Sequence, residues 1–216
     1  MKDPTNSVKR RILKATGEFL LLSLVSLLVP LIVAIDIRFF STGFLEILLT
    51  EMAQEVLLGI SAILFAIKAY QCPASRGFLT LVAGMFLTML IRESDAYLDR
   101  WVYHGFWVWP AGIVTFSAVS YATLKCGDTI WKPMGNFVDT KSHSCITMGM
   151  ITLLVLSRSL GSGELLWKHI LGNNAETMLL KTALQEGLEL YGYIFICYGS
   201  WLFRREGTPN FSTPAA

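Results

Sequence analysis

Six stretches of mostly apolar residues alternate with short polar segments along this chain. Most of them reach the roughly 17–25 residues that a helix needs to cross the hydrocarbon core of a bilayer. The pattern therefore predicts an all-α, polytopic integral membrane protein, a helical bundle with six transmembrane helices. The predicted spans cover residues 19–35, 51–70, 77–91, 105–124, 144–160 and 175–203.

The ends of these stretches carry recognisable helix signals. Asn173 and Asn174 come directly before the last stretch, where they are good N-cap residues, and Glu176 falls in its first turn. The third stretch is expected to continue as helix into the charged run 92–100. The second and fifth stretches have short uncharged cores, so a count of five spans is the alternative.

Composition supports a membrane protein. Hydrophobic residues make up 53% of the 216 residues and charged residues only 16%, well below the roughly 25% that is usual in soluble domains. The apolar stretches predict a single transmembrane domain over residues 1–205, and the Gly, Pro, Ser and Thr of residues 206–216 predict a disordered cytoplasmic tail. The net charge of +2 gives no argument for a nucleic-acid partner, so the expected partner is the lipid bilayer.

The distribution of basic residues predicts the orientation. If six spans alternate in direction, twelve of the eighteen Lys and Arg residues fall on the side that holds both termini. The positive-inside rule then places both termini in the cytoplasm, an N-in and C-in topology. Residues 36–40 offer no small-residue cleavage site after the first stretch, so we expect an uncleaved first span. These features favour a bacterial cytoplasmic (inner) membrane.

With this topology, acidic and basic residues gather at the outer ends of four helices. Glu51 and Glu55 are four residues apart and share one helix face, while Arg92 can reach Asp95. Ionisable groups at membrane depth cost roughly 2.5–3.5 kcal/mol each, so they usually mark a pathway or a site. The predicted set of ion- or substrate-binding residues is Glu55, Arg92, Glu93, Asp95, Asp99, His104, Glu186 and Glu189.

Three functions are compatible with this set. The first, which we prefer, is a small ion- or proton-coupled transporter or channel-like protein, in which carboxylates bind a cation or relay protons. The second is a membrane-embedded enzyme acting on a lipid or lipid-linked substrate. In a metal-dependent form of this enzyme, the carboxylates and histidines hold a divalent metal. The third is a structural or accessory subunit, in which Arg92 or Arg158 pairs with a glutamate and locks helices together. No catalytic residue or cofactor is assigned, because the sequence contains neither H-E-x-x-H nor G-x-S-x-G.

Overall fold

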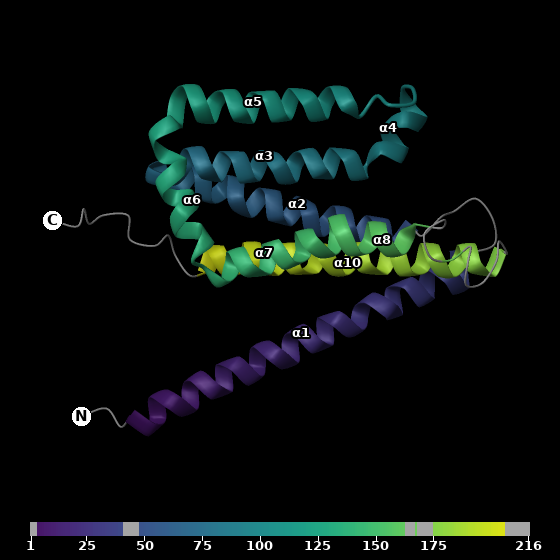
Figure 1. The fold of residues 1–216 in the computed structure, drawn as a ribbon, viewed down its shortest axis with the longest axis horizontal. Coiled ribbons are helices and arrows are strands. Elements are labelled where there is room, and N and C mark those ends of the chain that lie inside the picture. Colours follow the sequence, from purple (N-terminus) through teal and green to yellow (C-terminus); the bar gives the residue numbers. More distant parts are fainter. Residues whose placement is uncertain (1–3, 41–47, 163–166, 168–174, 206–216) are drawn as a thin grey trace.

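The computed structural model describes residues 4–40, 48–162, 167 and 175–205, and within these ranges it contains helices and turns but no strand (Figure 1). The predicted all-α class is therefore confirmed. The predicted tail, 206–216, lies outside the described residues. The long helices are α1 (Pro4–Phe40), α2 (Leu48–Gln71), α3 (Arg76–Glu93), α5 (Val108–Cys126), α7 (Lys141–Ile151) and α10 (Ala175–Arg205). The shorter elements are η1 (Pro73–Ser75), α4 (Asp95–Trp101), η2 (Gly127–Thr129), α6 (Trp131–Val138), the π-helical segment η3 (Thr152–Ser157) and α8 (Arg158–Gly161).

Four helical segments in the described part of the chain are long and apolar enough to cross a membrane. They correspond to the first, second, third and fifth predicted spans, and they cover Ile12–Arg38, Leu49–Gln71, Pro73–Glu93 and Lys141–Gly161. The other two predicted spans form the continuous helices α5 and α10 but lack a sufficiently apolar stretch. In α10 the reason is visible in the sequence, since Glu186 and Glu189 interrupt its apolar residues.

The helices pack side by side in an order that differs from their order in the chain. Helix α2 packs against both α3 and α10, α3 also packs against α5, and α10 also packs against α7. In the part of the chain that the structure describes, helix α1 packs mainly against α10 and α2, and it leans away from them toward its first residue (Figure 1). Successive long helices alternate in direction, so the start of α1 and the end of α10 lie at the same end of the bundle.

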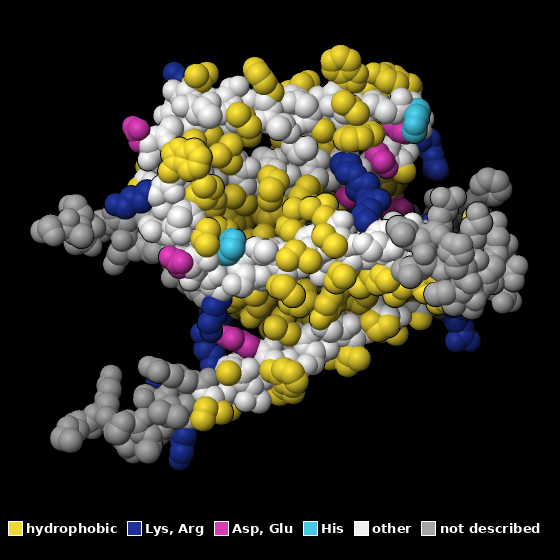
Figure 2. Space-filling model, in the orientation of Figure 1, with side chains coloured by type: hydrophobic (Ala, Val, Ile, Leu, Met, Phe, Trp, Pro, Cys, Tyr) yellow, Lys and Arg dark blue, Asp and Glu magenta, His cyan; other side chains and the backbone are white. Residues whose placement is uncertain are grey.

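This alternation gives the bundle two distinct ends. We call one the acidic end, at the right of Figure 1, where α2 and α10 begin and α3 and α8 end. The other, the basic end, is where α1 begins and α2, α5 and α10 end. Large apolar side chains cover much of the outer surface between the two ends (Figure 2), among them Phe19, Leu24, Val56, Ile113 and Phe116. Such a surface is suited to contact with lipid tails rather than water.

The apolar core lies between α2, α3 and α10 and is rich in phenylalanine. The rings of Phe65 and Phe203 are stacked with centroids 5.2 Å apart, and Phe86 contacts Phe65 edge-on at 5.6 Å. Phe137 of α6 packs against the same cluster. This core fills the part of the bundle toward the basic end and leaves the acidic end to polar side chains.

Helix α3 continues into the charged run as predicted, as far as Glu93, and α4 carries the run on from Asp95. Ser94 alone separates the two helices. The Ser94 hydroxyl donates to the Leu90 carbonyl at 3.0 Å, a local bond that competes with the helical pattern.

Candidate functional site

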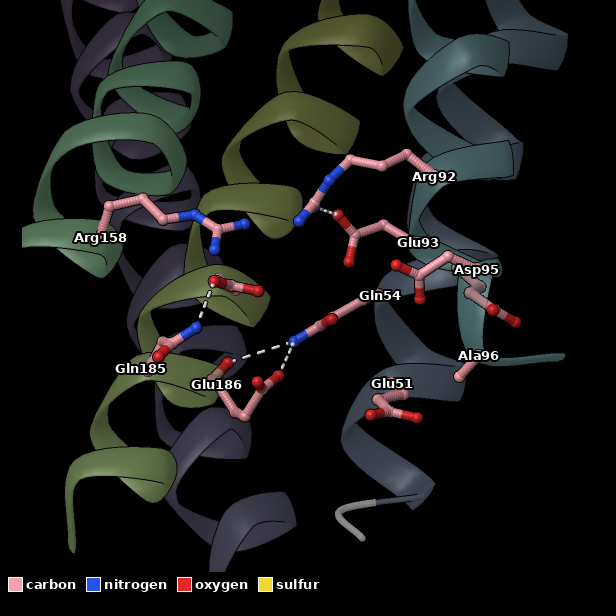
Figure 3. Close-up of a pocket in the computed structure, with 11 residues that line it drawn as sticks. Glu51, Gln54, Arg92, Glu93, Asp95, Ala96, Arg158, Gln185 and Glu186 are labelled. Atoms are coloured by element: carbon pink, nitrogen blue, oxygen red, sulfur yellow. Dashed lines mark hydrogen bonds and ion pairs between the residues drawn. The ribbon is translucent and has the colours of Figure 1, made fainter. Parts of the chain in front are cut away.

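A cavity of about 150 Å³ opens at the acidic end of the bundle. Its walls come from α2, the junction of α3 and α4, α8 and α10 (Figure 3). Nearly every lining residue is charged or carries an amide group. They are Glu51, Gln54, Glu55, Arg92, Glu93, Asp95, Ala96, Arg158, Gln185, Glu186 and Glu189.

Six of the eight residues predicted from the sequence line this cavity. The six are Glu55, Arg92, Glu93, Asp95, Glu186 and Glu189. The other two, Asp99 and His104, are not among its lining residues. His104 Nδ1 lies 2.7 Å from Asp99 Oδ2, and Asp99 Oδ1 accepts a hydrogen bond from the Gly105 amide at 2.9 Å. They hold the turn between α4 and α5, where Gly105 has φ +85°, a backbone region that glycine adopts at little cost.

The first wall is formed where α2 meets α10. The Gln54 amide is buried and donates to the Glu186 carboxylate at 3.1 Å and to the Glu186 carbonyl at 3.3 Å (Figure 3). Gln54 is one turn after Glu51 on α2, so both side chains face the cavity. The bond ties the two helices together and fixes where the Glu186 carboxylate points.

The second wall holds the most buried carboxylate of the cavity. Glu189 is 5% exposed, and it accepts hydrogen bonds from the Ser157 hydroxyl at 2.7 Å and from the Gln185 amide at 3.2 Å. Ser157 is the last residue of the π-helical segment η3. A π-helical turn shifts the side chains that follow it relative to a regular helix and is frequent at functional sites.

The third wall comes from the end of α3. Arg92 forms an ion pair with Glu93 at 2.5 Å, so the expected contact between Arg92 and Asp95 is replaced by one with the adjacent residue. The Ser94 hydroxyl donates to the Glu55 carboxylate at 3.0 Å and so links α3 to α2. Ser94, which interrupts the helix, thereby also orients one of the predicted site residues.

The charges of the cavity are strongly unbalanced. Six carboxylates face it, against the guanidinium groups of Arg92 and Arg158. Arg158 points into the cavity from α8, opposite Arg92 (Figure 3), and makes no ion pair within 4.0 Å with any residue that the structure describes. Clefts lined by one sign of charge concentrate ions of the opposite sign.

The cavity ends on the apolar core. One turn beyond Gln54 on α2 is Leu58, and one turn beyond Glu189 on α10 is Tyr193, both 0% exposed. As for metals, the described ranges contain no group of three or more His, Cys, Asp or Glu residues that could hold an ion. The carboxylates thus line the cavity without converging on a single point.

Sequence reasoning missed several residues of this site. Gln54, Gln185 and Ser157 are uncharged, and only their position inside otherwise apolar helices could have singled them out. Glu51 and Arg158 are charged residues at the predicted membrane depth, but they are not in the predicted set of site residues. Comparisons with family models, with curated proteins and with solved structures gave no match.

Proposed function

We propose that this chain is a small cation-handling membrane protein, an ion- or proton-coupled transporter or channel-like protein whose acidic cavity receives the solute. The observation that carries the proposal is the excess of carboxylates in one cavity beside an apolar core. Isolated charges at helix ends reach the headgroups and need no partner, but Glu189 is buried and Glu186 is tied to Gln54 inside the bundle. Carboxylates that cost free energy to bury are typical of ion pathways.

The proposal includes six spans with both termini in the cytoplasm. Helices α5 and α10 would cross the membrane with the four strongly apolar segments, because they run alongside them and alternate with them in direction (Figure 1). The basic end would then face the cytoplasm, as the positive-inside rule requires. In a bacterial inner membrane, the acidic cavity would open outward and meet solutes before they cross.

A structural or accessory role is the second candidate, and the hydrogen bonds of the cavity favour it. Gln54 joins α2 to α10, Ser157 joins η3 to α10 and Ser94 joins α3 to α2. Such bonds hold helices together where lipid provides no hydrophobic driving force. Under this alternative, the carboxylates are acceptors that fix the packing, and no solute passes.

Cation flux through the purified protein separates the two roles. The protein is reconstituted into liposomes, and uptake of Na⁺, Rb⁺ and methylammonium is compared with uptake by empty liposomes. We expect at least one of these cations to enter faster than into empty liposomes. Glu186→Gln should abolish that uptake and leave the protein folded, because the amide keeps the size of the side chain and removes its charge.

The matched control is Glu18→Gln, which changes the partly exposed partner of Lys14 near the basic end and should leave uptake unchanged. Uptake no faster than in empty liposomes contradicts the proposal, and so does equal uptake by the Glu186→Gln variant and the original protein. Loss of folding in Glu186→Gln also contradicts it and supports the structural role.

A further inference from the structure

A second cavity, of about 430 Å³, lies between α1 and α10. Its lining residues are apolar except for Ser26 and Tyr191. Pro30, Ala34 and Leu180 in its walls are exposed, so the cavity is open at the surface, and we call it the apolar groove. Since α1 is long and apolar enough to cross a membrane, an open groove along it faces lipid tails.

The groove has the depth of one leaflet of a bilayer. Its lining residues recur at spacings of one and three on each helix, over residues 26–37 of α1 and 180–191 of α10, which is the stripe of a single helix face. Eleven residues at a rise of 1.5 Å cover about 16.5 Å. This is about half of the roughly 30 Å hydrocarbon core, so the groove matches the length of one acyl chain.

The inner end of the groove is closed by its two polar side chains. The two helices run in opposite directions (Figure 1), so Ser26 and Tyr191 lie at the same end of the groove, and the Ser26 hydroxyl donates to the Tyr191 hydroxyl at 3.4 Å. A buried water needs two to four polar partners. Because these two groups bond to each other and the other walls are apolar, the groove suits a hydrocarbon chain better than water.

The outer end of the groove carries two cations. Arg38 lies four residues after Ala34, and Lys181 three residues before Leu184, so each shares a helix face with a lining residue. Arg38 is exposed and ends the apolar segment of α1, which places it at the membrane surface. Among the described residues neither cation has a carboxylate within 4.0 Å, and the nearby Asp36 accepts hydrogen bonds from amides at the start of α2.

The width of the groove separates an acyl chain from a helix as its occupant. Its volume divided by its length gives a mean cross-section of about 26 Å². A helix with side chains is about 10 Å across and needs a cross-section of about 80 Å². An empty groove would cost the dispersion contacts of both walls, and 17% of the most apolar window of α1 is buried, against 33–44% in the other three apolar segments.

We propose that the apolar groove binds one acyl chain of an anionic phospholipid, whose phosphate group contacts Arg38 and Lys181. Basic side chains beside a groove between membrane helices are a recurrent way of holding lipid headgroups. The site goes beyond the proposed function, because it requires no movement of a solute. It lies on the face of α10 that carries Gly187, between the cavity residues Glu186 and Glu189, so the bound lipid supports α10 from the side opposite the acidic cavity.

The test uses phosphatidylglycerol with a photoreactive diazirine on one acyl chain, and phosphatidylcholine with the same chain as the neutral comparison. The protein is reconstituted into liposomes with each lipid and irradiated, and its cross-linked peptides are quantified by mass spectrometry. Phosphatidylglycerol should label residues 26–37 and 180–191 at least about fivefold more than phosphatidylcholine, the gain that one basic residue near a membrane surface provides. The exposed face of α5 at Phe116 should be labelled equally by both lipids.

Two sets of variants locate the headgroup and the chain. Arg38→Gln combined with Lys181→Gln should reduce labelling of the groove by phosphatidylglycerol to the level of phosphatidylcholine. The matched control, Arg100→Gln combined with Lys125→Gln, removes two exposed basic residues elsewhere and should leave the labelling unchanged. Ala183→Trp, which fills the groove from α10, should abolish labelling of residues 26–37 by either lipid.

Equal labelling of the groove by the two lipids overturns the inference, and so does labelling by phosphatidylglycerol that survives Arg38→Gln combined with Lys181→Gln. Native mass spectrometry of the purified protein tests the other occupant. A dimer that carries no phospholipid would assign the groove to a second copy of the chain and would also overturn the inference. Since the charge variants change residues at the ends of the groove and leave its apolar walls intact, their result stands even if Ala183→Trp fails to fold.

Discussion

The hydrogen bond between Ser157 and Glu189 gives the sharpest test of how the cavity is built. It joins η3 to α10 at 2.7 Å, and both side chains are buried. Neutral hydrogen bonds between membrane helices contribute about 0.6 kcal/mol on average and at most about 1.7 kcal/mol. Bonds to charged groups contribute about 1.5–3 kcal/mol. Because the acceptor is a carboxylate that also keeps its bond from Gln185, we expect a coupling free energy of about 1.5–2 kcal/mol.

A double-mutant cycle measures this coupling. Ser157→Ala, Glu189→Met and the double variant are unfolded by SDS titration in mixed micelles, and their free energies of unfolding are compared with that of the original protein. The second cycle pairs Glu189→Met with Ser117→Ala, an exposed serine on α5, and its coupling should be close to zero because distant sites are additive. A Ser157–Glu189 coupling below about 0.5 kcal/mol would refute the reasoning that this hydrogen bond holds η3 against α10.

Two further changes test how the helices are packed and capped. In Gly149→Ala, the new Cβ would lie 2.6 Å from the Gly192 carbonyl oxygen, so the free energy of unfolding should fall by about 1–3 kcal/mol. Gly112→Ala, with nothing within 4 Å, should not destabilise the protein in the same SDS titration. The buried Asp36 accepts bonds from the amides of Leu49 and Thr50 at 3.1 and 2.8 Å. Asp36→Ala should therefore cost about 1–2 kcal/mol as an N-terminal cap is lost, and an unchanged titration midpoint would contradict this role.

The pattern of apolar and polar residues predicted the helical class and most helix positions. Helix formation follows from bonds within one segment, and in lipid a spanning segment satisfies all its backbone groups as a helix. Successive spans alternate in direction. This alternation alone was enough to expect Glu55, Glu93 and Glu186 at the same end of the bundle. The π-helical segment η3 and the break at Ser94 escaped prediction, because no pattern of apolar and polar positions marks a π-helical turn or the bond from the Ser94 hydroxyl to the Leu90 carbonyl.

What the sequence determined by itself is local: where helices run, and which of their ends carry acids. Tertiary structure decided which residues share a cavity, since Asp99 and His104 pair with each other while Gln54 and Arg158 enter the wall. It also decided the lateral order of the helices, in which α10 lies between α2 and α7. Helix neighbours in a membrane are selected by close contacts such as that of Gly149 with Gly192, and these depend on residues far apart in the chain whose pairing no local pattern encodes.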